Sequence, residues 1–166
     1  MNKPAALCVS LIFLLCLFSP DLVGAPRPEL LKNFDQLLSA LKLGQEVRLV
    51  IHYEKCWKKP GGEGSPPEKG PAAVGGMALV NFEYFPAGLI PGQARAFISS
   101  STLQFIQHQR HGVVYNYARV RVFSDNRVEI TVRYYQPQTF EVLMEDVYQT
   151  VMADRKNEGG AFFYRR

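Results

Sequence analysis

The sequence predicts an α+β fold, in which one N-terminal amphipathic helix packs on an antiparallel β-meander or partly closed barrel of about 6–8 strands. Three observations support this prediction. Leucines recur with helical spacing near residue 30, β-branched and aromatic segments follow Gly44, and apolar residues match one another across two turns in the second half of the chain. A chain of about 140 residues after removal of a leader is long enough for one domain with one core.

The first 24 residues have the layout of a cleavable signal peptide. Lys3 precedes an apolar run from Ala5 to Phe18, and Pro20 and the small residue Gly24 follow it. Cleavage after Gly24 is favoured, because cleavage one residue later would leave Pro26 directly after the scissile bond. The run is shorter than the roughly 20 apolar residues of a membrane-spanning helix, so no stable membrane anchor is expected. We therefore expect a secreted, extracellular protein whose single domain covers residues 25–166.

Residues 29–44 are predicted to form the helix. Pro28 suits the first helical position, and Gly44 can close the helix in the left-handed conformation. The apolar side chains have the i, i+4, i+7 spacing that places them on one helical face. They are Leu30, Leu31, Phe34, Leu37, Leu38 and Leu41.

The segments after Gly44 predict strands, because they are rich in β-branched and aromatic residues. Between the first two strands, residues 60–76 are crowded with Gly, Pro, Glu and Lys, which predicts a flexible loop. The predicted strands cover residues 46–53, 77–85, 95–100, 103–108, 113–123, 127–135, 140–148 and 161–164.

The alternation of side chains between the two faces of a strand predicts the register of the hairpin around residues 124–126. A three-residue loop places Val122 opposite Val128 and Val120 opposite Ile130, which makes one face aliphatic. The other face then pairs Arg121 with Glu129. A two-residue loop would oppose Val122 to Glu129 and mix the two faces.

The same argument applied to a loop at residues 136–138 places Tyr134 opposite Phe140, Ile130 opposite Met144, and Arg133 opposite Glu141. Three strands then share one apolar side. This register also places Glu129 beside Glu145, an unfavourable pair of like charges.

Cys56 is the one cysteine that remains after removal of the leader. Strand alternation places it on one face with His52 and Glu54, which raises the alternative of a thiol nucleophile with a histidine base. Residues two apart on a strand are about 7 Å apart, too far for the hydrogen bonds of a catalytic triad, so a packed cysteine is favoured. A disulfide-linked dimer through Cys56 is a further alternative.

His108 and His111 flank a turn and are the weak candidates for metal ligands, although no third ligand lies near them in the sequence. The net charge of +4 is spread along the chain, which argues against nucleic-acid binding. There is no Asn-x-Ser/Thr triplet for N-glycosylation and no phosphate-binding, calcium-binding or hydrolase motif, so we expect no cofactor.

Several segments together resemble the VirK family, whose members are small exported proteins, virulence-associated in bacteria and also present in animals. They are the helix segment 34–44, the strand 47–56, the Gly75-Gly76-Met77 and Phe82-Glu83-Tyr84-Phe85 segments, and the closing Phe162-Phe163-Tyr164. The resemblance implies export and a single domain. It supplies no catalytic residue, cofactor or substrate, and the Pro/Gly loop before Gly75 looks like an insertion in the family pattern.

The sequence therefore predicts a secreted, non-enzymatic binding or interaction module. Its ligand would be a protein or a small apolar molecule in an aromatic-lined pocket. The alternative is a secreted thiol-dependent enzyme or hydrolase that uses Cys56 with a histidine. The aromatic residues that favour the binding module are Phe82, Tyr84, Tyr115, Tyr117 and Tyr135.

Overall fold

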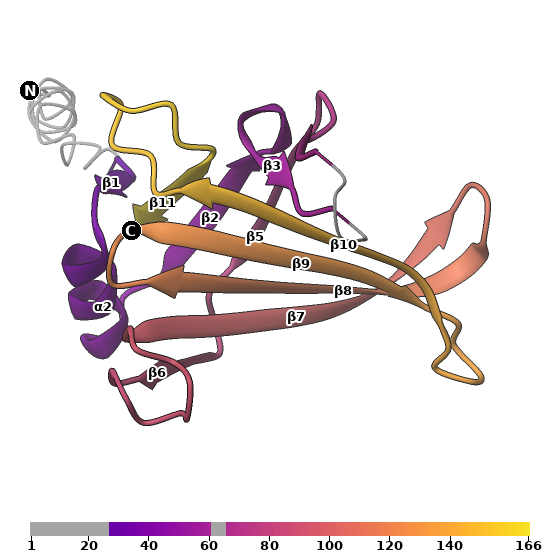
Figure 1. Cartoon of the computed structure of the whole chain (residues 1–166), viewed down its shortest axis with the longest axis horizontal. Coiled ribbons are helices and arrows are strands. Elements are labelled where there is room, and N and C mark those ends of the chain that lie inside the picture. Colours follow the sequence, from indigo (N-terminus) through magenta and orange to yellow (C-terminus); the bar gives the residue numbers. More distant parts are fainter. Residues whose placement is uncertain (1–26, 61–65) are drawn as a thin grey trace, which may run out of the picture.

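The computed structural model describes residues 27–60 and 66–166, and these residues form two antiparallel β-sheets and one α-helix (Figure 1). The predicted signal peptide lies outside the described residues. Eleven strands are present in the described ranges, more than the six to eight predicted. They form two separate sheets, so the partly closed barrel is wrong.

The small sheet brings together strands from both ends of the domain. In spatial order it consists of β1 (Glu29–Leu31), β11 (Ala161–Arg165), β2 (Val47–His52) and β5 (Val74–Ala78). The C-terminal strand β11 lies between β1 and β2, and Leu31 pairs with Phe163. The end of the chain is therefore a structural part of the domain.

The large sheet has seven strands, and its four central ones are long. Its spatial order is β4 (Glu68–Lys69), β3 (Trp57–Lys58), β10 (Val142–Val151), β9 (Arg127–Tyr135), β8 (Gly112–Phe123), β7 (Phe97–His108) and β6 (Phe82–Phe85). A short 3-10 helix, η1 (Tyr53–Lys55), connects the two sheets between β2 and β3. The predicted strands 95–100 and 103–108 are one continuous strand, β7.

The predicted helix is wrong at its start. Residues Glu29–Leu31 are strand β1, and the helix α2 covers Phe34–Lys42. Asn33 is the N-cap, because its side chain accepts a hydrogen bond from the backbone N–H of Gln36 at 3.0 Å. Leu30 and Leu31 are buried in the small sheet. Their spacing relative to Phe34 and Leu37 agrees with the helical pattern by coincidence.

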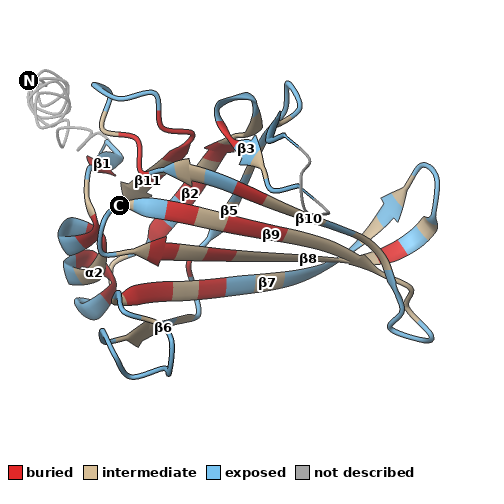
Figure 2. Ribbon diagram, in the orientation of Figure 1, coloured by how far each residue is buried: buried red, intermediate tan, exposed pale blue. Residues whose placement is uncertain are grey.

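The core lies between the two sheets at the end of the molecule occupied by α2 (Figure 1). We call the face of the large sheet that contributes to this core the inner face and the opposite one the outer face. Figure 2 shows buried residues concentrated near α2 and exposed residues toward the far ends of the long strands. The core residues include Phe34, Leu37, Ala40 and Leu41 from α2, Leu49, Ile51 and Phe163 from the small sheet, and Val120, Val122, Val128 and Ile130 from the large sheet.

The predicted register of the β8–β9 hairpin is confirmed. Val122 pairs with Val128, Val120 with Ile130, and Arg121 with Glu129. Asn126 adopts a positive φ of 65°, as the three-residue loop requires.

The predicted register of β9 and β10 is wrong by four residues. Gln136 and Glu141 close a longer turn, and a bulge follows between Val142 and Met144. Arg133 therefore pairs with Glu145 rather than Glu141. The shift is even, so each side chain keeps its predicted face, and Glu129 lies opposite Gln149 instead of beside Glu145.

Regular structure begins inside the predicted loop 60–76. Strand β4 pairs with β3, and β5 begins at Val74. A Cβ atom on Gly76 would lie 2.6 Å from the carbonyl oxygen of Leu49, so this glycine allows the close approach of β5 to β2. Some of the glycines that predicted flexibility are therefore packing positions.

Candidate functional site

The far half of the outer face carries a group of aromatic and aliphatic side chains, which we call the aromatic face. Phe105 and Leu103 are 65% and 54% exposed, although both lie in a regular strand. The ring of Phe105 contacts that of Tyr115, which stacks on Phe140 with 5.9 Å between ring centroids. Exposed apolar groups that gather on one face of a sheet are typical of interaction surfaces. The aromatic face consists of Leu103, Phe105, Tyr115, Tyr117, Tyr135 and Phe140.

Three arginines adjoin the aromatic face on the same side of the sheet. Arg121 lies 3.9 Å from the carboxylate of Glu129, and Arg133 donates a hydrogen bond to Glu145 at 2.9 Å. Arg119 lies between them in the sheet. The hydrogen bond from Arg133 is the main cause that holds the pKa of Glu145 below its usual range, and the charge of Arg119 adds to it.

Of these three arginines, Arg119 is the one that forms no salt bridge with a carboxylate of the described residues. Its guanidinium donates a hydrogen bond to the hydroxyl of Thr131 at 3.4 Å, and its Nε atom, like those of Arg121 and Arg133, is buried with no hydrogen-bond acceptor in the described part of the chain. The cross-strand neighbours of Arg119 are Ser101 and Thr131, both small and neutral. Among these three arginines, Arg119 is therefore the one whose guanidinium is not engaged in a salt bridge and can pair with an external anion.

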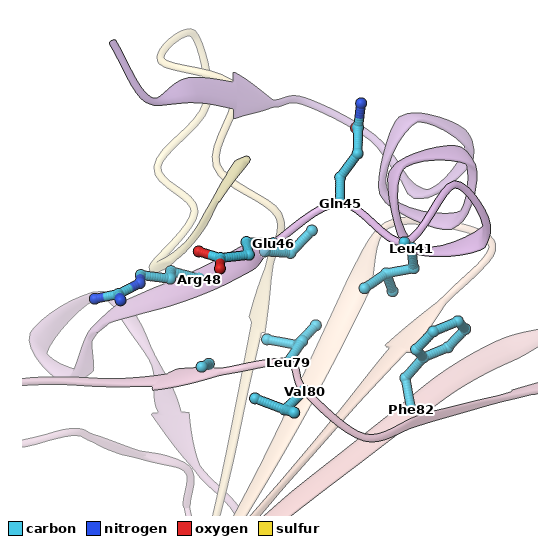
Figure 3. Close-up of a pocket in the computed structure, with 10 residues that line it drawn as sticks. Leu41, Gln45, Glu46, Arg48, Leu79, Val80 and Phe82 are labelled. Atoms are coloured by element: carbon cyan, nitrogen blue, oxygen red, sulfur yellow. The ribbon is translucent and has the colours of Figure 1, made fainter. Parts of the chain in front are cut away.

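A separate pocket of about 340 Å³ lies where α2 ends and β2 begins (Figure 3). Leu41, Leu79 and Phe82 form its apolar part, and Glu46 and Arg48 extend along its other end. It has one aromatic residue in its lining, and no histidine, cysteine, serine or threonine. The pocket has room for a small apolar group, but its lining contains no nucleophile.

The predicted aromatic residues fall into two places. Tyr115, Tyr117 and Tyr135 belong to the aromatic face. Phe82 and Tyr84 instead pack against the core near α2, where Tyr84 lies 6.4 Å from the ring of Phe34. The sequence grouped residues that the fold separates.

The structure places Cys56 in the core, with no exposed surface. Its thiol donates a 3.4 Å hydrogen bond to the carbonyl oxygen of His52, and burial raises its pKa above the ordinary value. The ring of His52 packs against Phe162 at 5.2 Å. A nucleophilic cysteine needs an accessible thiol of lowered pKa, whereas the thiol of Cys56 is buried and its pKa is raised. Burial likewise keeps the thiol from a second chain unless this segment opens.

The rings of His108 and His111 stack 4.9 Å apart at the β7–β8 turn. The Nδ1 atom of His108 accepts hydrogen bonds from the backbone N–H groups of Arg110 and His111, which occupies one of its two ligating atoms. No cluster of three or more His, Cys, Asp or Glu side chains suited to a metal occurs among residues 27–60 and 66–166. The ring of His108 therefore accepts two backbone hydrogen bonds within the turn.

No helix within the described residues is long and apolar enough to cross a membrane.

The fold and the exposed outer face define a two-sheet antiparallel β-protein with one helix over its core and an open aromatic surface. The VirK protein family model matches residues 30–140, and the chain belongs to this family. No curated protein matches the chain. A crystal structure of a VirK family protein from Legionella pneumophila is similar to this chain, with a TM-score of 0.60 and 13% sequence identity, over 81% of this chain and 97% of that one. That likeness concerns the fold.

Proposed function

We propose that this VirK family protein is a secreted, non-enzymatic interaction module that binds a protein partner through the aromatic face. The observation that carries the proposal is the exposure of Phe105, Leu103 and Phe140 on regular secondary structure and its turn. Their burial against a partner would remove apolar surface from water, at about 25 cal/mol for each Å². Aromatic residues and arginine are also the types enriched in protein interfaces.

The chemistry of the described residues favours binding over catalysis. The buried thiol of Cys56, with its raised pKa, supports a structural role for this residue rather than the thiol-dependent enzyme. The signal-peptide layout of the first 24 residues supports export. An exposed sheet face suits a protein surface better than a small ligand, which binds in a concave site.

Site-specific photo-crosslinking in cells that secrete the chain tests the proposal. A benzoylphenylalanine at position 140 should give light-dependent adducts of one discrete mass. The same group in place of Leu43, which is 72% exposed at the end of α2, should give none. The substitution Tyr117→Ser should weaken the adduct at position 140. Equal adducts at both positions, or none at position 140, would contradict the proposal.

A further inference from the structure

The far half of β7 is an open sheet edge. Strand β6 pairs with Phe97–Ser100, and its first residue, Phe82, lies opposite Ser100. The segment Ser101–His108 continues to pair with β8, but no strand of the described residues pairs with its other side (Figure 1). Every second residue of this segment therefore directs its backbone N–H and C=O groups away from the sheet.

This edge has none of the features that normally prevent strand addition. Proteins protect long edge strands with proline, charged side chains or a bulge. The edge sequence, Ser-Thr-Leu-Gln-Phe-Ile-Gln-His, contains no proline, lysine, arginine or carboxylate, and its pairing with β8 is regular throughout. Leu103 and Phe105 also expose more than half of their surface along it.

Side chains that lie opposite one another on neighbouring strands form rows across the outer face. These rows indicate which types of side chain an added strand would need at each position. The last row that includes β6 runs from Glu83 through Ser99 to Arg121. The next row begins at Ser101 and continues to Arg119, and no residue of β6 pairs with Ser101, because β6 begins at Phe82 opposite Ser100 and the preceding Asn81 instead accepts a hydrogen bond from the Ser100 hydroxyl at 2.6 Å. Because Ser101 is small, an acidic side chain in that position can reach over it to the guanidinium of Arg119.

The following two rows begin with apolar residues. Leu103 leads to Tyr117, and Phe105 leads to Tyr115. Side chains opposite Leu103 and Phe105 on an added strand would therefore lie against the aromatic face. At the other end, a hollow of about 480 Å³ lined by Val80, Asn81, Glu83 and Ser99–Ser101 leaves room for the end of such a strand.

We propose that the edge Ser101–His108 binds an extended peptide segment of a partner by strand addition, with the pattern apolar-x-apolar-x-acidic read from its amino end. The peptide runs antiparallel to β7, in line with β6, so that its acidic side chain lies opposite Ser101 and pairs with Arg119. Main-chain hydrogen bonds provide affinity, and the alternate side chains provide specificity. This inference rests on the proposed function, since it names the class of partner for the same surface.

Fluorescence anisotropy with a labelled peptide that contains Val-Thr-Phe-Thr-Glu tests the proposal on the full chain. Binding should saturate. Changing the peptide glutamate to glutamine, or Arg119→Gln in the protein, should each weaken binding about fivefold, and the two changes together should weaken it no further. The matched control Arg127→Gln, which removes another salt-bridged arginine at the start of β9 away from the aromatic face, should bind as the wild type does. Phe105→Lys should abolish binding, with thermal unfolding as the check that each variant folds.

Backbone methylation distinguishes strand addition from other modes of binding. N-methyl groups on one set of alternate peptide residues should abolish binding, and on the other set should leave it unchanged, because only one set faces the edge. Equal effects of the two sets, or no binding of the unmodified peptide, would overturn the proposal.

The outcomes separate this inference from the proposed function. If the position 140 adduct forms but the peptide does not bind, the aromatic face remains the interaction surface and the edge proposal fails. If the chain sediments as a dimer and Phe105→Lys makes it monomeric, the edge binds a second copy, which also overturns the peptide proposal.

Discussion

Replacement of Leu37 by alanine tests whether α2 is part of the core. The side chain of Leu37 is fully buried, in the same cluster as residues of both sheets. The substitution removes the equivalent of about three methylene groups, worth about 2.4 kcal/mol in lost burial at 0.8 kcal/mol each. The cavity left between helix and sheets adds to this loss, so the free energy of unfolding should fall by about 3–4 kcal/mol.

Equilibrium unfolding in urea measures this change, and Leu43→Ala is the matched control. Leu43 is the C-cap of the same helix and is 72% exposed, so its truncation should change the free energy of unfolding by less than about 0.5 kcal/mol. Equal effects at the two positions, or a loss below about 1 kcal/mol for Leu37→Ala, would refute the placement of α2 in the core.

Three further predictions concern the thiol, the ion pairs and export. Cys56 in the native protein should resist iodoacetamide at neutral pH and react once the chain is unfolded; modification of the native protein, followed by mass spectrometry, would contradict its burial. The lowered pKa of Glu145 stabilises the folded state at neutral pH and ceases to do so as the pH falls through its folded pKa, so the melting temperature should fall less on acidification in Glu145→Gln than in the wild type. The secreted protein should begin at Ala25, and an N-terminal sequence that includes the apolar run would exclude cleavage after Gly24.

The sequence was most informative where apolar and polar residues alternate strictly. In the β8–β9 hairpin, a shift by one residue would bring Val122 opposite Glu129, so the faces alone determine the pairing. A shift by an even number of residues leaves every side chain on the same face, so the alternation of apolar and polar residues cannot detect it. The turn before β10 is longer than predicted and has Phe140 at a φ of 57°, a conformation that a bulky residue rarely adopts. The like-charge pair of Glu129 and Glu145 was the available sign that the predicted register was wrong.

The start of α2 was predictable from a signal that the leucine spacing obscured. Asn33 and Gln36 have the spacing of a helix N-terminal capping pair, and the side chain of Gln36 accepts a hydrogen bond from the backbone N–H of Lys32. The pairing of β1 with the C-terminal strand is different. It joins residues more than 130 positions apart, and no local pattern reports such a contact.

In the candidate site, too, some features follow from local sequence patterns and others depend on how distant strands pair. The pairing of Arg119 with Thr131 rather than with a carboxylate follows from the predicted hairpin register. The open edge beside it depends on where β6 begins relative to β7, which is a property of the sheet and not of either strand. His52, Cys56, His108 and His111 were prominent in the sequence because of their chemistry, and the fold uses them for packing and turn formation.

Amide hydrogen exchange, resolved residue by residue along β7 by NMR, tests most directly the claim that an open edge adjoins the aromatic face. In the unliganded monomer, amides between Phe97 and Ser100 should all be protected, because β6 and β8 pair with this part on both sides. From Ser101 to His108, protected amides should alternate with amides that exchange rapidly. Uniform protection along the whole strand would contradict the account, since it would show that the edge is already covered.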